Sequence, residues 1–212
     1  MTGFSRNIIS KLYDTFECNI LKDYKSSIEI IQKKIEFIGS EIIVDIGGGT
    51  GFILKKLFTN VGKSINIDVS EQMLLQQKNN EIYRLQADGS QLPLSNESVD
   101  IIFLLNVLHH IDKEKHRSLF EEIYRVLKNN GVFFIIDLYY PMTFLNRLFT
   151  KVEEFSVGKT YHVSTNQIQR HLKEVKLNQY SINYLDEHQW NFAIKAIKKK
   201  DRKMSITCTH TP

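Results

Sequence analysis

The chain has 212 residues, which is enough for one domain or for one domain with a small addition. Its hydrophobic fraction of 42% and charged fraction of 25% are ordinary for a globular protein, and no apolar run approaches the length of a membrane span. The net charge of +4 is concentrated near the end, where residues 195–203 hold six Lys and Arg against Asp201. The rest of the chain is close to neutral, so we interpret this stretch as a solvated tail rather than a nucleic-acid or membrane patch.

The cysteines and the N-terminal residues predict the compartment. Cys18 and Cys208 are far apart in sequence and do not have the spacing of metal ligands. The N-terminal residues lack the long apolar stretch of a secretory signal. These features predict a cytoplasmic, reducing setting and no metal site.

Helical and strand patterns alternate up to Asp137. Tyr24–Ile38 has apolar residues at helical spacing, and strand and helix candidates then follow in turn. Such alternation predicts a parallel sheet that is covered by helices on both faces. The strands are expected at Ile42–Ile46, Ser64–Asp68, Ile82–Ala87, Val99–Leu105 and Gly131–Asp137, and the helices at Phe52–Phe58, Ser70–Lys78 and Lys113–Leu127.

The pattern changes after Asp137. Residues 139–163 are irregular and aromatic, and they could line an acceptor pocket, contact a second copy of the chain or belong to the core. A helix is expected at Ser164–Val175, followed by strands at Gln179–Leu185 and Trp190–Ile197. We therefore expect a helical cap over residues 1–40, one α/β domain over 41–198 and a basic tail over 199–212.

The segment 44–51 connects a strand to a helix through glycines. Asp45 ends an apolar run, and Gly47, Gly49 and Gly51 follow at alternate positions. A strand, a glycine turn and a helix in this order build a nucleotide-type site, since glycine lets the backbone approach a ligand closely. In a dinucleotide fingerprint the third glycine would stand at Phe52, so the spacing disfavours NAD.

Two further carboxylates end the next two predicted strands. Asp68 can accept hydrogen bonds from both ribose hydroxyls of a nucleoside. Asp88 can accept a hydrogen bond from the exocyclic amine of adenine, with the backbone of Gly89 at the ring edge. The alternative for Asp88 is a structural one, as the cap of a helix or a turn.

The fourth strand is followed by Asn106-Val107-Leu108-His109-His110. Ligands of such sheets bind outside the carboxyl ends of the strands, so His109, His110 and Asp137 are expected near the reacting groups. Histidine titrates closest to neutrality, which makes either one a candidate general base. Either could instead cap a helix or shape the pocket, and Asp137 could be a base or could orient a neighbour.

Four motifs in this order resemble those of the class I S-adenosylmethionine-dependent methyltransferases. They are D-x-G-x-G-x-G from Asp45, D-x-S-x-x-M-L from Asp68, A-D-G from Ala87 and the segment from Asn106. The resemblance covers roughly residues 41–138 and is greatest to the "type 11" small-molecule group, which includes enzymes that methylate quinone precursors. It implies an α/β, Rossmann-like, doubly wound sheet of seven strands in the order 3-2-1-4-5-7-6, with strand 7 antiparallel.

The resemblance also implies the cofactor S-adenosylmethionine, with S-adenosylhomocysteine as its product. Met73 would lie against the adenine, and Tyr13 would pack over the cofactor; for both, packing in the core is the alternative. The implied cofactor-binding residues are Tyr13, Asp45, Gly47, Gly49, Gly51, Asp68, Val69, Met73, Asp88, Gly89 and Asn106.

The expected reaction is in-line transfer of a methyl group to a small-molecule acceptor, by a monomer or homodimer. One alternative is a non-catalytic subunit or sensor that binds the cofactor. A nucleic-acid or protein methyltransferase is less favoured, because Asn106-Val107-Leu108-His109 stands where amino-methylating nucleic-acid enzymes often carry an N/D-P-P-Y/F tetrapeptide.

Overall fold

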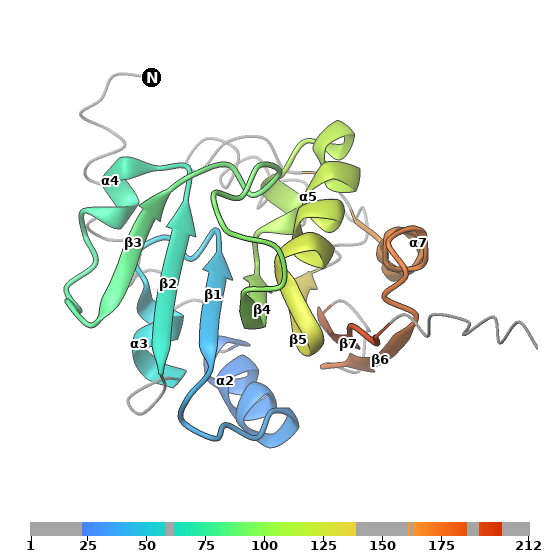
Figure 1. Ribbon diagram of the computed structural model, residues 1–212, viewed down its shortest axis with the longest axis horizontal. Helices are drawn as coiled ribbons and strands as arrows, with labels where there is room; N and C mark the ends of the chain where they lie inside the picture. The colour runs from blue at the N-terminus through green and yellow to red at the C-terminus, as the bar shows by residue number, and fades with distance from the viewer. Residues whose placement is uncertain (1–22, 58–61, 139–160, 162, 186–190, 201–212) are drawn as a thin grey trace, which may run out of the picture.

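The computed structural model describes residues 23–57, 62–138, 161, 163–185 and 191–200, and these form one twisted sheet with helices on both faces (Figure 1). The sheet has seven strands in the order β3-β2-β1-β4-β5-β7-β6. The strands from β1 to β5 pair in parallel, whereas β7 is antiparallel to both β5 and β6. The predicted fold class and strand order are confirmed.

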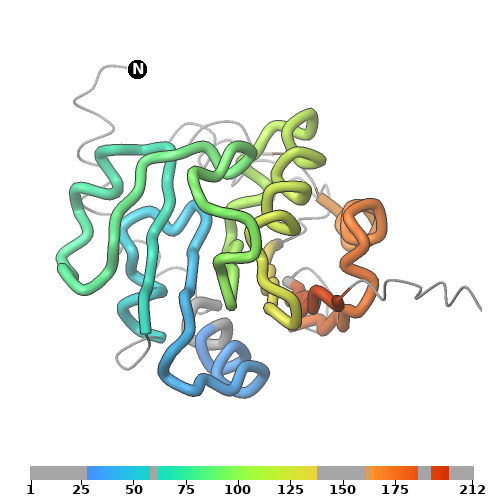
Figure 2. Tube along the Cα trace, in the orientation of Figure 1, coloured from blue at the N-terminus to red at the C-terminus, as the bar shows by residue number. Residues whose placement is uncertain are grey.

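Figure 2 shows the path of the chain from β1 outward to β3 and back across to β4. The neighbours β1 and β4 therefore mark the point where the order of the strands reverses. The strands are β1 (Ile42–Ile46), β2 (Lys63–Asp68), β3 (Ile82–Gln86), β4 (Val99–Leu105), β5 (Leu127–Leu138), β6 (Gln179–Tyr184) and β7 (Asn191–Ile197).

The alternation of side chains along each strand divides the apolar core into two halves. In β1, Val44 belongs to the half beneath α5 and α7, and Ile43 belongs to the half beneath α2 and α3. Successive residues of a strand point to opposite faces, so the central strands have to be apolar on both faces. The helices are α2 (Asp23–Lys34), α3 (Phe52–Leu57), α4 (Glu71–Leu74), the 3₁₀ turn η1 (Leu108–His110), α5 (Lys113–Val126) and α7 (Thr165–Glu174).

Three predicted boundaries are wrong by several residues. The helix α2 ends at Lys34 rather than Ile38. The amides of Ile38 and Gly39 instead donate to the carboxylate of Glu41. The helix α4 ends at Leu74, and the amides of Gln76 and Gln77 then bond to the carbonyls three residues back, as in a 3₁₀ turn. At the other end of α4, Ser70 is the N-cap, since its side chain accepts from the Met73 amide.

The third difference lies at Asn129-Asn130-Gly131, between the helix expected to end at Leu127 and the strand expected to begin at Gly131. The strand β5 instead begins at Leu127, directly after α5. Its pairing with β4 shifts register between Val99 and Ile101, and Asn130 has a φ of 64° there. Asparagine tolerates this left-handed conformation, so the three residues form an irregularity within the strand rather than a turn before it.

Buried and half-buried cations anchor α5 at its C-terminal end. The Arg125 guanidinium donates to the backbone carbonyls of Leu92 and Leu94 (2.9 and 2.8 Å). The buried Lys198 ammonium donates to the carbonyls of Tyr124 and Leu127 (2.9 and 2.8 Å). The Tyr124 carbonyl lies in the last turn of α5, where carbonyls have no partner within the helix, so Lys198 satisfies it. Arg125 instead fixes the loop after Asp88 against α5.

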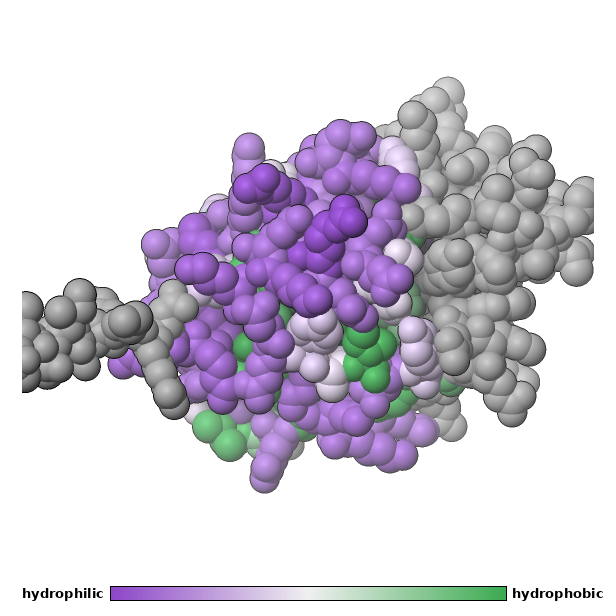
Figure 3. Space-filling model, turned by 90° about the vertical axis from the view of Figure 1, so that its right-hand side faces the viewer, coloured by the Kyte–Doolittle hydropathy of each residue, from purple (hydrophilic) through white to green (hydrophobic). Residues whose placement is uncertain are grey.

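The side of the molecule that Figure 3 views is mainly hydrophilic over its described part, with hydrophobic side chains only in small separate groups. Among the described helices, none has both the length and the hydropathy needed to cross a bilayer.

Replacing Phe120 by Ala is expected to lower the free energy of unfolding by about 3 to 5 kcal/mol. The Phe120 side chain is fully buried between the rings of Phe133 and His171, with centroids 5.8 and 5.2 Å away. Chemical denaturation checks this value. The exposed Tyr83 on the edge strand β3 is the control, and Tyr83→Ala should change stability by less than about 1 kcal/mol. Equal losses in the two variants would contradict the packing described here.

Candidate functional site

The polar residues singled out from the sequence gather at one edge of the sheet, beside the β1–β4 reversal. Asp45 lies near the end of β1, and Asp68 is the last residue of β2. His109 follows β4, and Asp137 lies near the end of β5. The carboxyl ends of these four parallel strands meet at this edge, as the sequence predicted.

The glycine loop, residues 47–51, has a backbone that other residues would adopt only under strain. Gly47, Gly49 and Gly51 have φ angles of 74°, 54° and 73°. Gly48 is required for a different reason, because an added Cβ would stand 2.4 Å from Asn66 Oδ1 and 2.7 Å from Asp45 Oδ2. Side chains at these four positions would strain the backbone or collide with the residues packed beneath it, so the loop keeps this shape only with glycine there.

Asp45 is buried beneath this loop. Its side chain is 1% exposed, and its Oδ1 has no hydrogen-bond donor among the described residues. Burial, with a smaller contribution from the nearby charge of Asp68, raises the pKa of Asp45 to about 8. Asp45 therefore carries a proton at neutral pH when no cation lies close to it.

Asp68 is held in place by the backbone on either side. Its Oδ2 accepts from the Gly49 amide (2.9 Å), and its Oδ1 accepts from the Ser70 amide (2.8 Å). Burial raises the pKa of Asp68, and these hydrogen bonds offset part of that rise. Next to it, the Val69 side chain is 66% exposed, which gives the site an apolar surface beside an oriented carboxylate.

Two buried amide side chains lie under the loop, and neither was expected at the site from the sequence. Asn66 is fully buried in β2, and Gln77 is 5% exposed after α4. Asn66 is a cross-strand neighbour of Asp45 in the β1–β2 pairing. A polar residue between Ile65 and Ile67 was the available signal for Asn66, whereas the position of Gln77 depends on where α4 ends.

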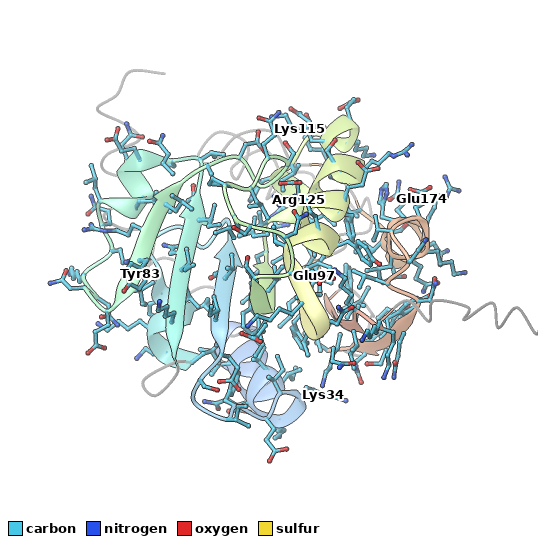
Figure 4. All side chains as sticks on the ribbon, viewed as in Figure 1. Lys34, Tyr83, Glu97, Lys115, Arg125 and Glu174 are labelled. Carbon is cyan, nitrogen blue, oxygen red and sulfur yellow. The ribbon has the colours of Figure 1, made fainter. Side chains whose placement is uncertain are left out.

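The structure gives Asp88 the turn role that was the alternative to adenine binding. Asp88 Oδ1 accepts from the Ser90 amide and hydroxyl (2.9 and 2.8 Å). Lys115, labelled in Figure 4, donates to Asp88 Oδ2 at 2.7 Å from α5. Burial alone would raise the pKa of Asp88, but the bonds from Lys115 and Ser90 keep it below its usual value. The adenine role of Asp88 remains a prediction.

Gly89 is buried, and an added Cβ would stand 2.8 Å from a methyl carbon of Ile46 and 3.0 Å from one of Leu119. Close packing between α5 and the sheet thus accounts for this glycine without a ligand.

His109 and Asp137 form a buried pair. His109 Nδ1 lies 2.6 Å from Asp137 Oδ1, and both side chains are at most 5% exposed. The ring of His110 stands beside that of His109, with centroids 4.0 Å apart. The backbone amide of Tyr161 donates to the His109 carbonyl (2.6 Å), and the Tyr161 hydroxyl donates to Asp112. These bonds fix the turn that carries both histidines.

Of the remaining predicted site residues, Asn106 and Met73 lie in the described part of the chain and the others lie outside it. Asn106 directly follows β4 with a φ of 56°, and its amide donates to the Ile136 carbonyl (2.8 Å). Met73 lies beside the loop, with its Cε 3.1 Å from where a Cβ on Gly49 would be. Tyr13, the aromatic stretch 139–160 and the tail beyond residue 200 lie outside the described residues.

Within the described residues, no group of three or more His, Cys, Asp or Glu side chains could hold a metal ion.

This set of residues fits S-adenosylmethionine. A cationic sulfonium or ammonium group close to Asp45 would favour its ionised form, which burial and, to a smaller extent, the charge of Asp68 disfavour. The buried Asp45 Oδ1 without a donor is an acceptor that suits a cationic ligand. The exposed Val69 beside Asp68 offers an apolar surface for a nucleoside ring.

Comparisons with known proteins agree with this geometry. Residues 44–135 match the family described as "Methyltransferase domain". The chain is 26% identical over 167 residues to the uncharacterized methyltransferase YcgJ of Bacillus subtilis, a match that covers 72% of this chain and 61% of the relative. The chain spans less than two thirds of the length of the first curated relatives that it matches.

Two solved structures share the fold. A methyltransferase from Haloferax volcanii, in complex with the Trm112 methyltransferase activator, has a TM-score of 0.74 at 14% identity, over 92% of this chain and 98% of that one. A phosphoethanolamine N-methyltransferase of Haemonchus contortus has a TM-score of 0.68 at 15% identity, over 83% of this chain and 53% of that one. The latter structure contains phosphomonomethylethanolamine and S-adenosylhomocysteine.

Replacing Asp45 by Asn is expected to flatten the dependence of stability on pH. A carboxyl group with a pKa of 3.8 in the unfolded chain and about 8 in the folded one favours the folded state at low pH. That contribution falls by about 1.4 kcal/mol per pH unit as the pH rises through this window, and it is lost above the folded pKa. Denaturation of both proteins without cofactor, at several pH values between about 5 and 8, measures the difference. Parallel curves for the two proteins would show that Asp45 ionises normally.

Replacing Asp68 by Ala is expected to weaken the binding of S-adenosylmethionine and S-adenosylhomocysteine by about 1 to 3 kcal/mol, because charge-assisted hydrogen bonds are lost. Calorimetric titration measures both affinities. Glu121→Ala, on the exposed face of α5, is the control and should bind as the unmodified chain does. An unchanged affinity in Asp68→Ala would remove Asp68 from the ribose role.

Proposed function

Because residues 44–135 form a class I S-adenosylmethionine-dependent methyltransferase domain, we propose that the chain is an enzyme that methylates a small-molecule acceptor. In this proposal His109 is the general base, and Asp137 is the residue that orients it. The observation that carries the proposal is the buried 2.6 Å contact between His109 Nδ1 and Asp137 Oδ1, at the edge of the sheet where ligands bind.

The cofactor-binding part of the proposal rests on the glycine loop and the two acids that flank it. Asp68 accepts from the ribose hydroxyls, Val69 and Met73 contact the adenine, and the backbone of the loop contacts the methionine part. When bound, S-adenosylmethionine supplies an activated methyl group and leaves as S-adenosylhomocysteine. The other proposed contacts come from Tyr13, Asp45, Asp88, Gly89 and Asn106.

The His109–Asp137 pair has the arrangement of an oriented base. A carboxylate opposite Nδ1 favours the tautomer that carries its hydrogen there, which leaves Nε2 as the basic nitrogen. The Asp137 charge also stabilises the imidazolium that forms when Nε2 takes a proton. In this arrangement Nε2 would take the proton that the acceptor's O–H, N–H or S–H group loses on methylation. His110 is the second candidate for this base, because its ring lies beside that of His109.

A small-molecule acceptor is favoured by two observations. The segment Asn106-Val107-Leu108-His109 does not have the tetrapeptide typical of amino-methylating nucleic-acid enzymes. The Haemonchus contortus protein that shares the fold holds a small phosphorylated amine together with the cofactor product. A cytoplasmic location belongs to the same proposal, since the two cysteines are far apart in sequence.

A second candidate function is that of a subunit that binds the cofactor without catalysis. The Haloferax volcanii protein with this fold forms a complex with a methyltransferase activator. A protein of this fold can therefore work together with a partner protein. An acceptor-dependent yield of S-adenosylhomocysteine separates the two functions, because a non-catalytic subunit would give none with any acceptor.

His109→Ala is expected to lower kcat by about 10²- to 10⁴-fold with an acceptor that must lose a proton, whereas the affinity for S-adenosylmethionine stays unchanged. The assay measures S-adenosylhomocysteine formed from phenols, amines and thiols across a range of pH. The unmodified chain should lose activity as His109 becomes protonated at acid pH, and the variant should not show this loss.

His110→Gln and Asp137→Asn complete this experiment. Asp137→Asn should lower kcat as His109→Ala does, because the imidazole loses its orientation and its counter-charge. His110→Gln should leave the pH profile unaltered. A full rate in His109→Ala at every pH would show that His109 is not the general base. If His110→Gln no longer loses activity at acid pH, the general base is His110 instead.

A further inference from the structure

We propose that Asn66 and Gln77 are positioning residues for the cofactor, because their buried amides hold the glycine loop in its binding shape through Gly49. Neither residue belongs to the set that is proposed above to touch the cofactor. The inference rests on the proposed role of the loop in cofactor binding and adds the device that sets the conformation of the loop.

The two amides form a chain of hydrogen bonds that ends on the loop. Asn66 Nδ2 donates to the Gly49 carbonyl and to Gln77 Oε1, both at 2.9 Å. Gln77 Nε2 donates to the carbonyls of Ile82 (2.8 Å) and Asn79 (3.2 Å). The chain thus connects the start of β3 to the loop.

These contacts leave one orientation for each amide. Both hydrogens of Asn66 Nδ2 are used, and both of its acceptors are oxygens that cannot donate. A flipped Asn66 would turn Oδ1 toward these oxygens and lose both bonds. The same holds for Gln77, whose Nε2 faces two backbone carbonyls.

Gly49 is therefore fixed on both sides. Its amide donates to Asp68 (2.9 Å), and its carbonyl accepts from Asn66 (2.9 Å). One glycine with a φ of 54° thus links the acid at the end of β2 to the amide chain. Movement of either partner would turn the peptide groups of the loop and the carboxylate of Asp68 together.

The amides also fill the space beneath the loop. A Cβ on Gly48 would stand 2.4 Å from Asn66 Oδ1, and one on Gly51 would stand 2.7 Å from Gln77 Oε1. Apolar side chains of the same size would fill this space as well, but they would not bind the Gly49 carbonyl. A buried hydrogen bond makes a modest net contribution to stability, and Asn66 Oδ1 has no donor among the described residues, so the specific effect of the two amides is on the conformation of the loop.

The experiment compares Gln77→Met, Asn66→Ser and the double variant. Methionine keeps the length of Gln77 and removes its hydrogen bonds, and serine keeps one donor where Asn66 uses two. Each single variant is expected to raise the Kd for S-adenosylmethionine and for S-adenosylhomocysteine about tenfold. Since Gln77 acts through Asn66, the double variant should bind about as weakly as Asn66→Ser alone, rather than with the product of the two effects.

Two further measurements separate positioning from stability. The amide resonances of Gly49 and Gly51, recorded without cofactor, are expected to shift in Gln77→Met. The control is Leu172→Ala in α7, a fully buried residue in the other half of the core, which should lower thermal stability without changing Kd. If Gln77→Met does not fold, Asn66→Ser alone gives the same two readouts.

Unchanged Kd values and glycine resonances in folded variants would overturn this inference and leave the proposed function intact. Additive losses in the double variant would overturn the route through Asn66. Failure of the unmodified chain to bind either sulfur compound would overturn the cofactor site, and the positioning role with it.

Discussion

Helices cover both faces of the central strands, and this constraint decides where polar groups can lie in this molecule. Val44, Ile102 and Phe103 are fully buried, so the middle of the sheet has no place for a solvated group. The polar residues of the site are therefore confined to the carboxyl edge. Asn66 is the exception, since it is fully buried two residues before the end of β2, and it lies with Asp45 directly below the glycine loop that the edge supports.

The same sheet carries two chemically different regions. The loop and Asp68 belong to β1 and β2, and the His109–Asp137 pair belongs to β4 and β5. Because β1 pairs with β4, a donor held at the first region and an acceptor held at the second would meet above the point of reversal. Holding two reactants in line can supply much of a rate enhancement, and a rigid sheet is suited to this task.

Local sequence patterns predicted most of the fold, but they did not predict most of the contacts between side chains within the site. Alternating apolar strands and helices, with the resemblance to a known family, predicted the strand order that the structure has. The pairing of Asp88 with Lys115 was not predicted, because the two residues are 27 positions apart and meet only through the packing of α5. The Asn66–Gln77 bond depends on the early end of α4, which helical periodicity alone did not predict.

The contact between Gly48 and Asn66 has a consequence for how this site can change in evolution. The conformation of Gly48 does not demand glycine, but the amide oxygen of Asn66 occupies the place of its Cβ. A side chain at position 48 and the Asn66 amide would therefore compete for the same space. A lineage that gains a side chain at position 48 has to make room at Asp45 and at Asn66, and a smaller residue at position 66 then loses the bond to the Gly49 carbonyl. Such a lineage would have to hold its glycine loop by other means.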